Sequence, residues 1–369
     1  MAENSPISPS AALSGALSPW MPAEWTVHER TWMEFPPSNE TFDNDLSGYR
    51  DTWMTVANTI AQYEPVTVIA NVGDRDEALS LADGSASHPI DVVETQIDDA
   101  WFRDSGPTFT LDAAGALGAV HWTFNAWGNA GFSVFGYEEQ VGRFAAELAG
   151  IAPERVSPSR LVNEGGSIHV DGDGTVLVTD TVQLDPGRNP DWSRHEVETE
   201  LHAQLGTNHA IWLPRGLTRD YDRLGTRGHV DMVTCFVRPG TLVAHAQPDP
   251  RHPDHDVCKE IVAFLRAQRD AHDRPLEVIE IAAPTVLSDR NGWVDYSYIN
   301  HYVCNRAVVL GAFDDPRDHQ AAEILSDLYP DREVVLVDAR RIFECGGGIH
   351  CITQQQPASV ARGRGQAGS

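Results

Sequence analysis

Short apolar runs, each interrupted by turn residues, recur along the chain and predict β-hairpins. The turns include Asp-Gly-Asp-Gly at residues 171–174 and Arg-Pro-Gly at residues 238–240, combinations that favour chain reversal between two strands. A further apolar run starts at Gly347 and predicts a last strand. The predicted hairpins cover residues 106–122, 167–180, 230–245 and 298–313.

Between the hairpins, apolar residues spaced three and four apart predict helices. Residues 137–150 place Val141, Phe144, Ala145 and Leu148 on one helical face, and Gly150 ends the pattern. The other predicted helices cover residues 195–206, 258–272 and 319–330, and strands follow them at residues 209–214, 276–281 and 332–338.

The order of hairpin, helix and strand therefore repeats. Pro107, Ser167, Val230 and Tyr298 mark the hairpin starts and are separated by 60, 63 and 68 residues. Repeated units of this kind bury their cores against their neighbours. The pattern predicts an α/β fold, either a closed ring of units, which would be an α/β propeller, or an ordinary mixed α/β domain with hairpins.

The composition indicates one domain over residues 20–357, because no linker interrupts that range. Residues 1–19 and 358–369 are predicted to be a disordered leader and tail, and the leader lacks the features of a secretion signal. The five cysteines are widely spaced and form no Cys-x-x-Cys pair. Reduced thiols and a cytoplasmic location are therefore expected.

The charge balance narrows the classes of partner. Lys and Arg number 27 against 54 Asp and Glu, which gives a formal net charge of −27. This argues against binding nucleic acid or an anionic membrane surface, and no apolar run is long enough for a spanning helix. An acidic chain attracts cationic substrates, although acidity also serves solubility. A homo-oligomer is compatible with the sequence, which does not fix the oligomeric state.

Cys351 is a candidate nucleophile. It follows three glycines at residues 346–348, which allow a backbone or ligand to approach closely. A reactive thiol needs access and a base or positive neighbour. A buried, unreactive cysteine is the alternative from this segment alone.

Five further residues are candidates for binding or proton transfer. If Val230 begins a strand, His229 and Asp231 point to one face, where they suit acid–base work on a cation; a surface hydrogen bond is the alternative. Asp104 lies near Trp101, so the pair could bind and stack a guanidinium, or Asp104 could belong to a turn. Glu164 precedes two glycines and could equally be a solvated turn acid.

Metal sites are weakly indicated. Residues 252–256 cluster His and Asp, but Pro253 and the acidic context favour a solvated loop. Residues 171–174 resemble part of a calcium loop without its later glutamate. The glycines at residues 346–348 lack the lysine of a phosphate-binding loop. We expect no metal.

Several segments taken together identify a protein family more specifically than any single segment does. The sequence resembles the family of agmatine deiminases and Porphyromonas-type peptidyl-arginine deiminases, which belongs to the guanidino-group-modifying superfamily, over roughly residues 20–357. The matching segments, in order, are MPAEW (21–25), HERTWM (28–33), DAWFRDSGPT (99–108), FNAWG (124–128), EGGSIHVDG (164–172), GHVD (228–231) and GGGIHCITQQ (346–355).

This resemblance implies a five-bladed α/β propeller, or pentein, built of ββαβ-type repeats around a central active site, without a cofactor. It implies hydrolysis of agmatine to N-carbamoylputrescine and ammonia through a covalent amidino-cysteine. Cys351 would attack the guanidinium carbon, and Asp104 and Asp231 would bind its nitrogens. His229, held by Glu164, would transfer protons, and Trp101 would contact the substrate.

The two carboxylates should also raise the pKa of Cys351, because like charges disfavour a thiolate. We therefore expect a neutral resting thiol that a cationic substrate helps to deprotonate.

Departures from the family pattern concern the substrate. Gly225 stands where agmatine deiminases often have an acidic residue, and Arg227 would repel an ammonium if it pointed inward. Met232 and Gly348 each replace a common Asn. The alternative substrates are peptidyl-arginine and another guanidino compound. The alternative reaction is amidino transfer to an amine. The alternative classes are a propeller that only binds and a metal hydrolase that a chelator would inactivate.

Overall fold

The computed structural model describes residues 19–129, 135–223, 225–290 and 292–359. The predicted leader and tail lie almost wholly outside these residues. In the described part, no helix is long and apolar enough to cross a bilayer.

A unit of two antiparallel strands, a helix and a third, parallel strand occurs five times among the described residues. The repeat expected from the sequence is thus confirmed. Four units follow the chain: β4 (Thr108–Leu111), β5 (Leu117–Thr123), α5 (Glu138–Leu148) and β6 (Val156–Val162); β7 (His169–Val170), β8 (Thr175–Thr179), α7 (Arg194–Leu205) and β9 (His209–Leu213); β10 (Thr234–Arg238), β11 (Thr241–Ala246), α8 (Asp254–Arg266) and β12 (Glu277–Ala282); β15 (Tyr302–Cys304), β16 (Ala307–Ala312), α9 (Asp318–Leu328) and β17 (Glu333–Asp338).

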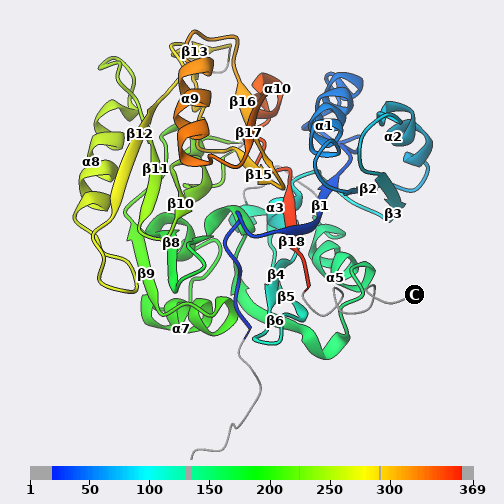
Figure 1. Cartoon of the computed structure of the whole chain (residues 1–369), viewed down its shortest axis with the longest axis horizontal. Helices are drawn as coiled ribbons and strands as arrows, with labels where there is room; N and C mark the ends of the chain where they lie inside the picture. The colour runs from blue at the N-terminus through cyan, green and yellow to red at the C-terminus, as the bar shows by residue number, and fades with distance from the viewer. Residues whose placement is uncertain (1–18, 130–134, 224, 291, 360–369) are drawn as a thin grey trace, which may run out of the picture.

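The fifth unit joins the two ends of the chain. Strand β18 (Gln354–Pro357) pairs antiparallel with β1 (His28–Glu34), which pairs parallel with β2 (Val66–Ala70) after helix α1 (Leu46–Ile60). Helix α2 (Arg75–Leu81) then leads to β3 (Ile90–Glu94), which extends this sheet to four strands. Figure 1 shows β18 beside β1, with the long helices on the outside of the molecule.

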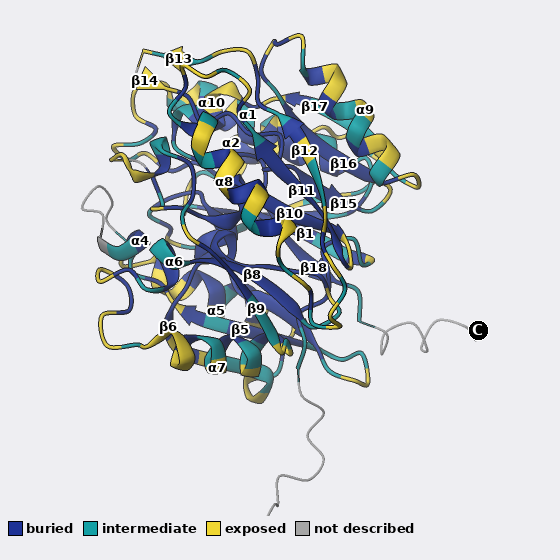
Figure 2. Ribbon diagram, turned by 90° about the vertical axis from the view of Figure 1, so that its left-hand side faces the viewer, coloured by how far each residue is buried: buried dark blue, intermediate teal, exposed yellow. Residues whose placement is uncertain are grey.

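Burial explains why the strands take these positions. Strands β8 and β16 are apolar in sequence and almost wholly buried, as expected for strands covered on both faces. Figure 2 shows buried strands inside and helices whose outer faces are exposed. Both ends of helix α7 are set by local interactions. Ser193 and Glu196 form a capping box at its start, and Gly206 ends it with φ 67°.

Short elements complete the fold. They are α3 (Phe102–Ser105), α4 (Ala126–Asn129), η1 (Pro153–Arg155), η2 (Gly165–Ser167), α6 (Asp180–Gln183), η3 (Arg219–Tyr221), η4 (Val230–Met232), β13 (Ser288–Asp289), β14 (Gly292–Trp293) and α10 (Arg340–Glu344).

Three local predictions were wrong. Val230 begins no strand but the 3₁₀ turn η4, and β10 starts at Thr234. The last strand starts at Gln354 and not at Gly347, so Cys351 lies in a turn. Helix α8 begins at Asp254 and ends at Arg266, so three of the five residues of the expected loop at 252–256 are helical. In the first two cases, the apolar residues that suggested a strand are buried in a turn. In the third, Pro253 stands at the N-cap of the helix and does not interrupt it.

Candidate active site

The candidate site is built from segments that occupy equivalent places in the five units. Each segment directly precedes the first strand of its unit: β4, β7, β10, β15 or β18. The short element η2 contacts both α3 and η4. The side chains that these segments supply are Asp104, Glu164, His229 with Asp231, Asn300 and Cys351.

The Cys351 thiol is buried among polar groups. Its Sγ lies 3.4 Å from Asp231 Oδ2, and Asn300 Nδ2 donates a hydrogen bond to it at 3.2 Å. Burial, together with the charges of Asp231 and Asp104, raises the pKa of the thiol well above its ordinary value. The resting thiol is therefore neutral, in the direction that the two carboxylates led us to expect.

Three charged groups converge on the backbone at Gly166. A Cβ at this position would lie 2.6 Å from His229 Nδ1 and 3.0 Å from both Asp104 Oδ1 and Asp231 Oδ2. Among the described residues, His229 Nδ1 and Asp231 Oδ1 are buried without a hydrogen-bond partner. The two carboxylates at this point match the positive charge and the N–H groups of a guanidinium, and the His229 ring lies beside them.

His229 is held in place by Glu164. The two side chains meet at 3.3 Å through His229 Nε2 and Glu164 Oε2. Burial acts to lower the pKa of His229, but Asp104 and Glu164 outweigh it and raise the pKa to about 9. The imidazole is therefore protonated at neutral pH and can serve as a general acid.

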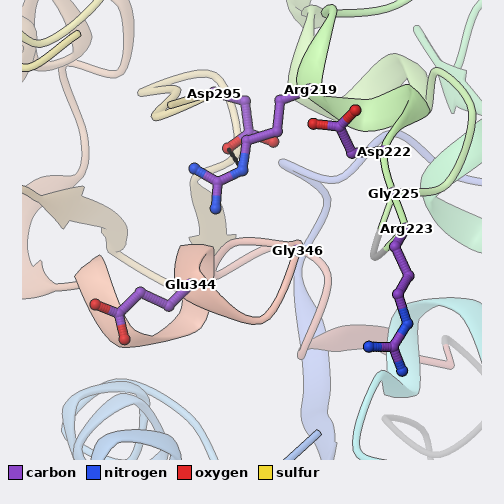
Figure 3. Close-up of a pocket in the computed structure, with 7 residues that line it drawn as sticks. All are labelled: Arg219, Asp222, Arg223, Gly225, Asp295, Glu344 and Gly346. Atoms are coloured by element: carbon purple, nitrogen blue, oxygen red, sulfur yellow. Dashed lines mark ion pairs between the residues drawn. The ribbon is translucent and has the colours of Figure 1, made fainter. Parts of the chain in front are cut away.

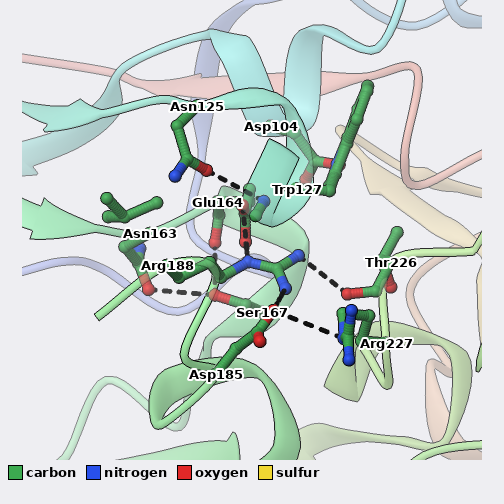
Figure 4. A network of polar contacts seen from close by, with 12 residues as sticks. Asp104, Asn125, Trp127, Asn163, Glu164, Ser167, Asp185, Arg188, Thr226 and Arg227 are labelled. Carbon is green, nitrogen blue, oxygen red and sulfur yellow. Dashed lines mark hydrogen bonds and ion pairs between the residues drawn. The ribbon is translucent and has the colours of Figure 1, made fainter. Parts of the chain in front are cut away.

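Glu164 in turn is paired with Arg188, a residue that we did not predict. Arg188 Nε donates to both Glu164 oxygens, at 2.9 and 3.1 Å, and Nη1 donates to Asp185 Oδ2 at 2.8 Å (Figure 4). Burial acts to raise the pKa of Glu164, but Arg188 and His229 outweigh it and hold the pKa at about 2. Glu164 thus stays ionised and orients the imidazole.

Asp104 is oriented by a strained segment. The indole Nε1 of Trp127 donates to Asp104 Oδ2 at 2.8 Å. Ala126 and Trp127 both have φ 54° and Gly128 has φ 82°, a left-handed run that costs non-glycine residues free energy and is typical of functional sites. Burial raises the pKa of Asp104 to about 6, against the opposing charge of His229.

A second unpredicted network lies beside the nucleophile. His350 Nδ1 is 2.8 Å from Asp231 Oδ2, and His350 Nε2 is 2.8 Å from Glu24 Oε1. The backbone N–H of His350 donates to Asn300 Oδ1 at 3.0 Å. These bonds tie Asp231 and Asn300 to the turn that carries Cys351.

A narrow cavity of about 20 Å³ reaches these groups. Trp101, Asp104, Trp127 and Cys351 line it, as does Gly347, where a Cβ would lie 2.5 Å from the Trp101 ring. Glycine is thus needed for the indole to lie next to the nucleophile. Within the described ranges, no group of three His, Cys, Asp or Glu side chains is placed to hold a metal ion.

Comparison with known proteins supports the resemblance seen in the sequence. The family model for Porphyromonas-type peptidyl-arginine deiminases matches residues 20–357. The chain belongs to this family.

Relatives of the deiminase chain cover nearly its whole length. A Streptomyces avermitilis protein named "Putative agmatine deiminase" is 56% identical over 341 residues, which cover 91% of this chain and 96% of the relative. An agmatine deiminase of Stutzerimonas stutzeri is 38% identical, with 93% and 96% covered. The structure of Enterococcus faecalis agmatine deiminase superposes with a TM-score of 0.86 at 28% identity, with 95% and 100% covered.

Two departures from the deiminase pattern have structural explanations. A Cβ at Gly225 would lie 2.1 Å from Asp220 O, so the tightly folded loop admits no side chain there. The Arg227 side chain is 53% exposed, and its Nε lies 3.4 Å from Asp185 Oδ2 (Figure 4). Arg227 therefore does not repel a cation inside the site.

Proposed function

We propose that this chain hydrolyses the guanidinium group of agmatine to N-carbamoylputrescine and ammonia. The observation that carries the proposal is the convergence of Asp104, Asp231 and His229 on one point at Gly166, with the Cys351 thiol 3.4 Å from Asp231. The names of the relatives support agmatine as the substrate.

In the bound substrate, Asp104 and Asp231 bind the guanidinium nitrogens through charge-assisted hydrogen bonds. Trp101 lies along the substrate from the wall of the cavity. The positive charge between the carboxylates offsets the repulsion that keeps the thiol protonated, so that substrate binding lowers the pKa of Cys351. The thiol proton passes to solvent.

The first half-reaction forms a covalent intermediate. The Cys351 thiolate attacks the guanidinium carbon and forms a C–S bond. Protonated His229 then donates its proton to one nitrogen, the C–N bond breaks with its electron pair on nitrogen, and ammonia leaves. A cationic amidino-cysteine remains. Covalent catalysis divides the hydrolysis of a resonance-stabilised group into two easier steps.

In the second half-reaction His229 acts as a base, because it became neutral when it gave up its proton in the first. His229 takes a proton from water, and the resulting hydroxide attacks the amidino carbon. The C–S bond breaks with its electron pair on sulfur, the thiolate takes the proton of the added hydroxyl group, and the neutral ureido product leaves. Glu164, ionised because of Arg188, stabilises the imidazolium in both steps.

We also propose that the five units are the blades of a five-bladed α/β propeller and that the enzyme works in the cytoplasm. Support for the ring comes from the shared strand order of the units and from the pairing of β18 with β1, by which the C-terminal strand completes the fifth unit. Support for the compartment comes from the cysteines, all five of which are free thiols.

The test compares agmatine, free arginine and an arginine-containing peptide with the purified chain. Ammonia and ureido product are measured for each, with Cys351→Ala as the control. We expect turnover of agmatine that is lost in Cys351→Ala. Turnover of the peptide without agmatine would move the function to peptide citrullination, and turnover that persists in Cys351→Ala would exclude the mechanism.

A further inference from the structure

A second, larger cavity adjoins the candidate active site. It measures about 420 Å³, and its wall includes Arg219, Asp222, Gly225, Asp295 and Glu344, as Figure 3 shows. Gly346 lines this cavity and also the narrow cavity at the nucleophile. The part of a substrate that extends beyond the guanidinium can therefore enter this space.

The positive charges on the wall are already matched. Arg219 Nη1 donates to Asp289 Oδ2 at 2.9 Å. Arg223, which also lines the cavity, pairs with Glu40 at 3.1 Å. Because Glu344 is paired with Arg290, Asp222 and Asp295 are the wall carboxylates that favour a cation.

Asp295 is the carboxylate that is best placed to bind such a cation. Its exposed fraction is 4%, and within the described residues its Oδ1 has no hydrogen-bond partner. Arg219 Nε lies 4.0 Å away, beyond hydrogen-bond distance. A buried carboxylate oxygen without such a bond carries a desolvation cost that a hydrogen-bonded ammonium would offset.

The surrounding charges agree with this geometry. Burial raises the pKa of Asp295 to about 7, with Asp220 and Asp254 adding to the rise and Arg219 opposing it. A cation bound against Asp295 would favour the ionised form. No carboxylate can come from position 225, because a Cβ there would lie 2.1 Å from Asp220 O.

We propose that Asp295 binds the cationic end of the guanidino substrate. The preferred substrates then carry a guanidinium at one end and an ammonium at the other. Free arginine fits less well, because its α-carboxylate would lie beside Asp295 and the exposed Asp222. This inference rests on the proposed deiminase function and adds to it the group that selects the far end of the substrate.

The test compares agmatine with butylguanidine, which has the same chain without the ammonium, in wild type and Asp295→Asn. We expect Asp295→Asn to raise the KM for agmatine roughly tenfold to 100-fold, the range for a charge-assisted hydrogen bond, with kcat and butylguanidine turnover unchanged. Glu344→Gln is the matched control, since Glu344 lines the same cavity but pairs with Arg290 at 3.4 Å. It should leave the ratio of the two substrates unchanged.

Two results would overturn the inference: an equal loss with both substrates, which would indicate a structural role for Asp295, or no change with either. Binding to Cys351→Ala, measured by calorimetry with and without Asp295→Asn, gives a second readout that needs no turnover. If agmatine binds through Asp295 but no ammonia is released, the proposed function fails while this assignment stands.

Discussion

Arg188 Nε lies 2.9 Å from Glu164 Oε1, and both side chains are completely buried. Each of two buried charges offsets the desolvation cost of the other, so removing one partner leaves the other as an uncompensated buried charge. The pair connects the stability of the fold to the chemistry of the site, because the same carboxylate orients His229 at 3.3 Å.

Arg188→Ala should lower the free energy of unfolding by about 3–5 kcal/mol, as measured by urea denaturation. The partly exposed pair of Arg194 and Asp180 supplies the control: Arg194→Ala should cost at most about 1 kcal/mol. The pKa of Glu164 is depressed to about 2, so the contribution of the pair is full above about pH 4.3 and is lost as pH falls through 2. Equal effects of the two variants would contradict this reading.

The Cys351 thiol should react as a neutral thiol in the free protein. Burial and the charges of Asp231 and Asp104 raise its pKa, so the rate of alkylation should keep rising with pH and reach no plateau below about pH 9. Asp231→Asn removes one of the charges and should shift the curve to lower pH. Mass spectrometry with Cys351→Ala identifies the labelled residue. A plateau below about pH 7 in wild type would refute the neutral resting thiol.

The sequence predicted most residues of the candidate site, because its short motifs carry the side chains that the structure brings together. Cys351, Asp104 and Glu164 each lie just before the first strand of a unit. Identifying the repeat in the sequence therefore also places these side chains at equivalent positions. The argument for His229 and Asp231 reached the right neighbours from a wrong premise. It assumed a strand at Val230, whereas the 3₁₀ turn η4 brings both side chains to Gly166.

The unpredicted residues act through contacts that local patterns do not carry. Glu24 and His350 hydrogen-bond across 326 positions of sequence, and Arg188 is one arginine in a stretch without a motif. Asn300 is different, because it precedes the first strand of the fourth unit along the chain just as Glu164 precedes that of the second. Comparing equivalent positions among the repeats would have identified it.

Asn300→Asp should lower kcat/KM roughly tenfold to 100-fold, the range for a hydrogen bond to a charged group. Asn300 Nδ2 donates to Cys351 Sγ at 3.2 Å, and a carboxylate there would replace the donor with a negative charge and raise the pKa of the thiol further. The same change at the exposed Asn208 serves as the control. The pH dependence of alkylation separates the effects, since a purely structural defect would leave the thiol pKa where it is.

Binding of a guanidinium should depend on the ionisation of Asp104. Burial raises the pKa of Asp104 to about 6, and the cation binds the ionised carboxylate. The affinity of Cys351→Ala for butylguanidine should therefore be constant above about pH 7 and fall about tenfold per unit below 6, because binding then requires the loss of a proton. Asp104→Asn should bind weakly at every pH, without this slope. Calorimetry between about pH 5 and about pH 8 measures both, and an affinity in Cys351→Ala that does not change over this range would exclude Asp104 as a direct ligand of the guanidinium.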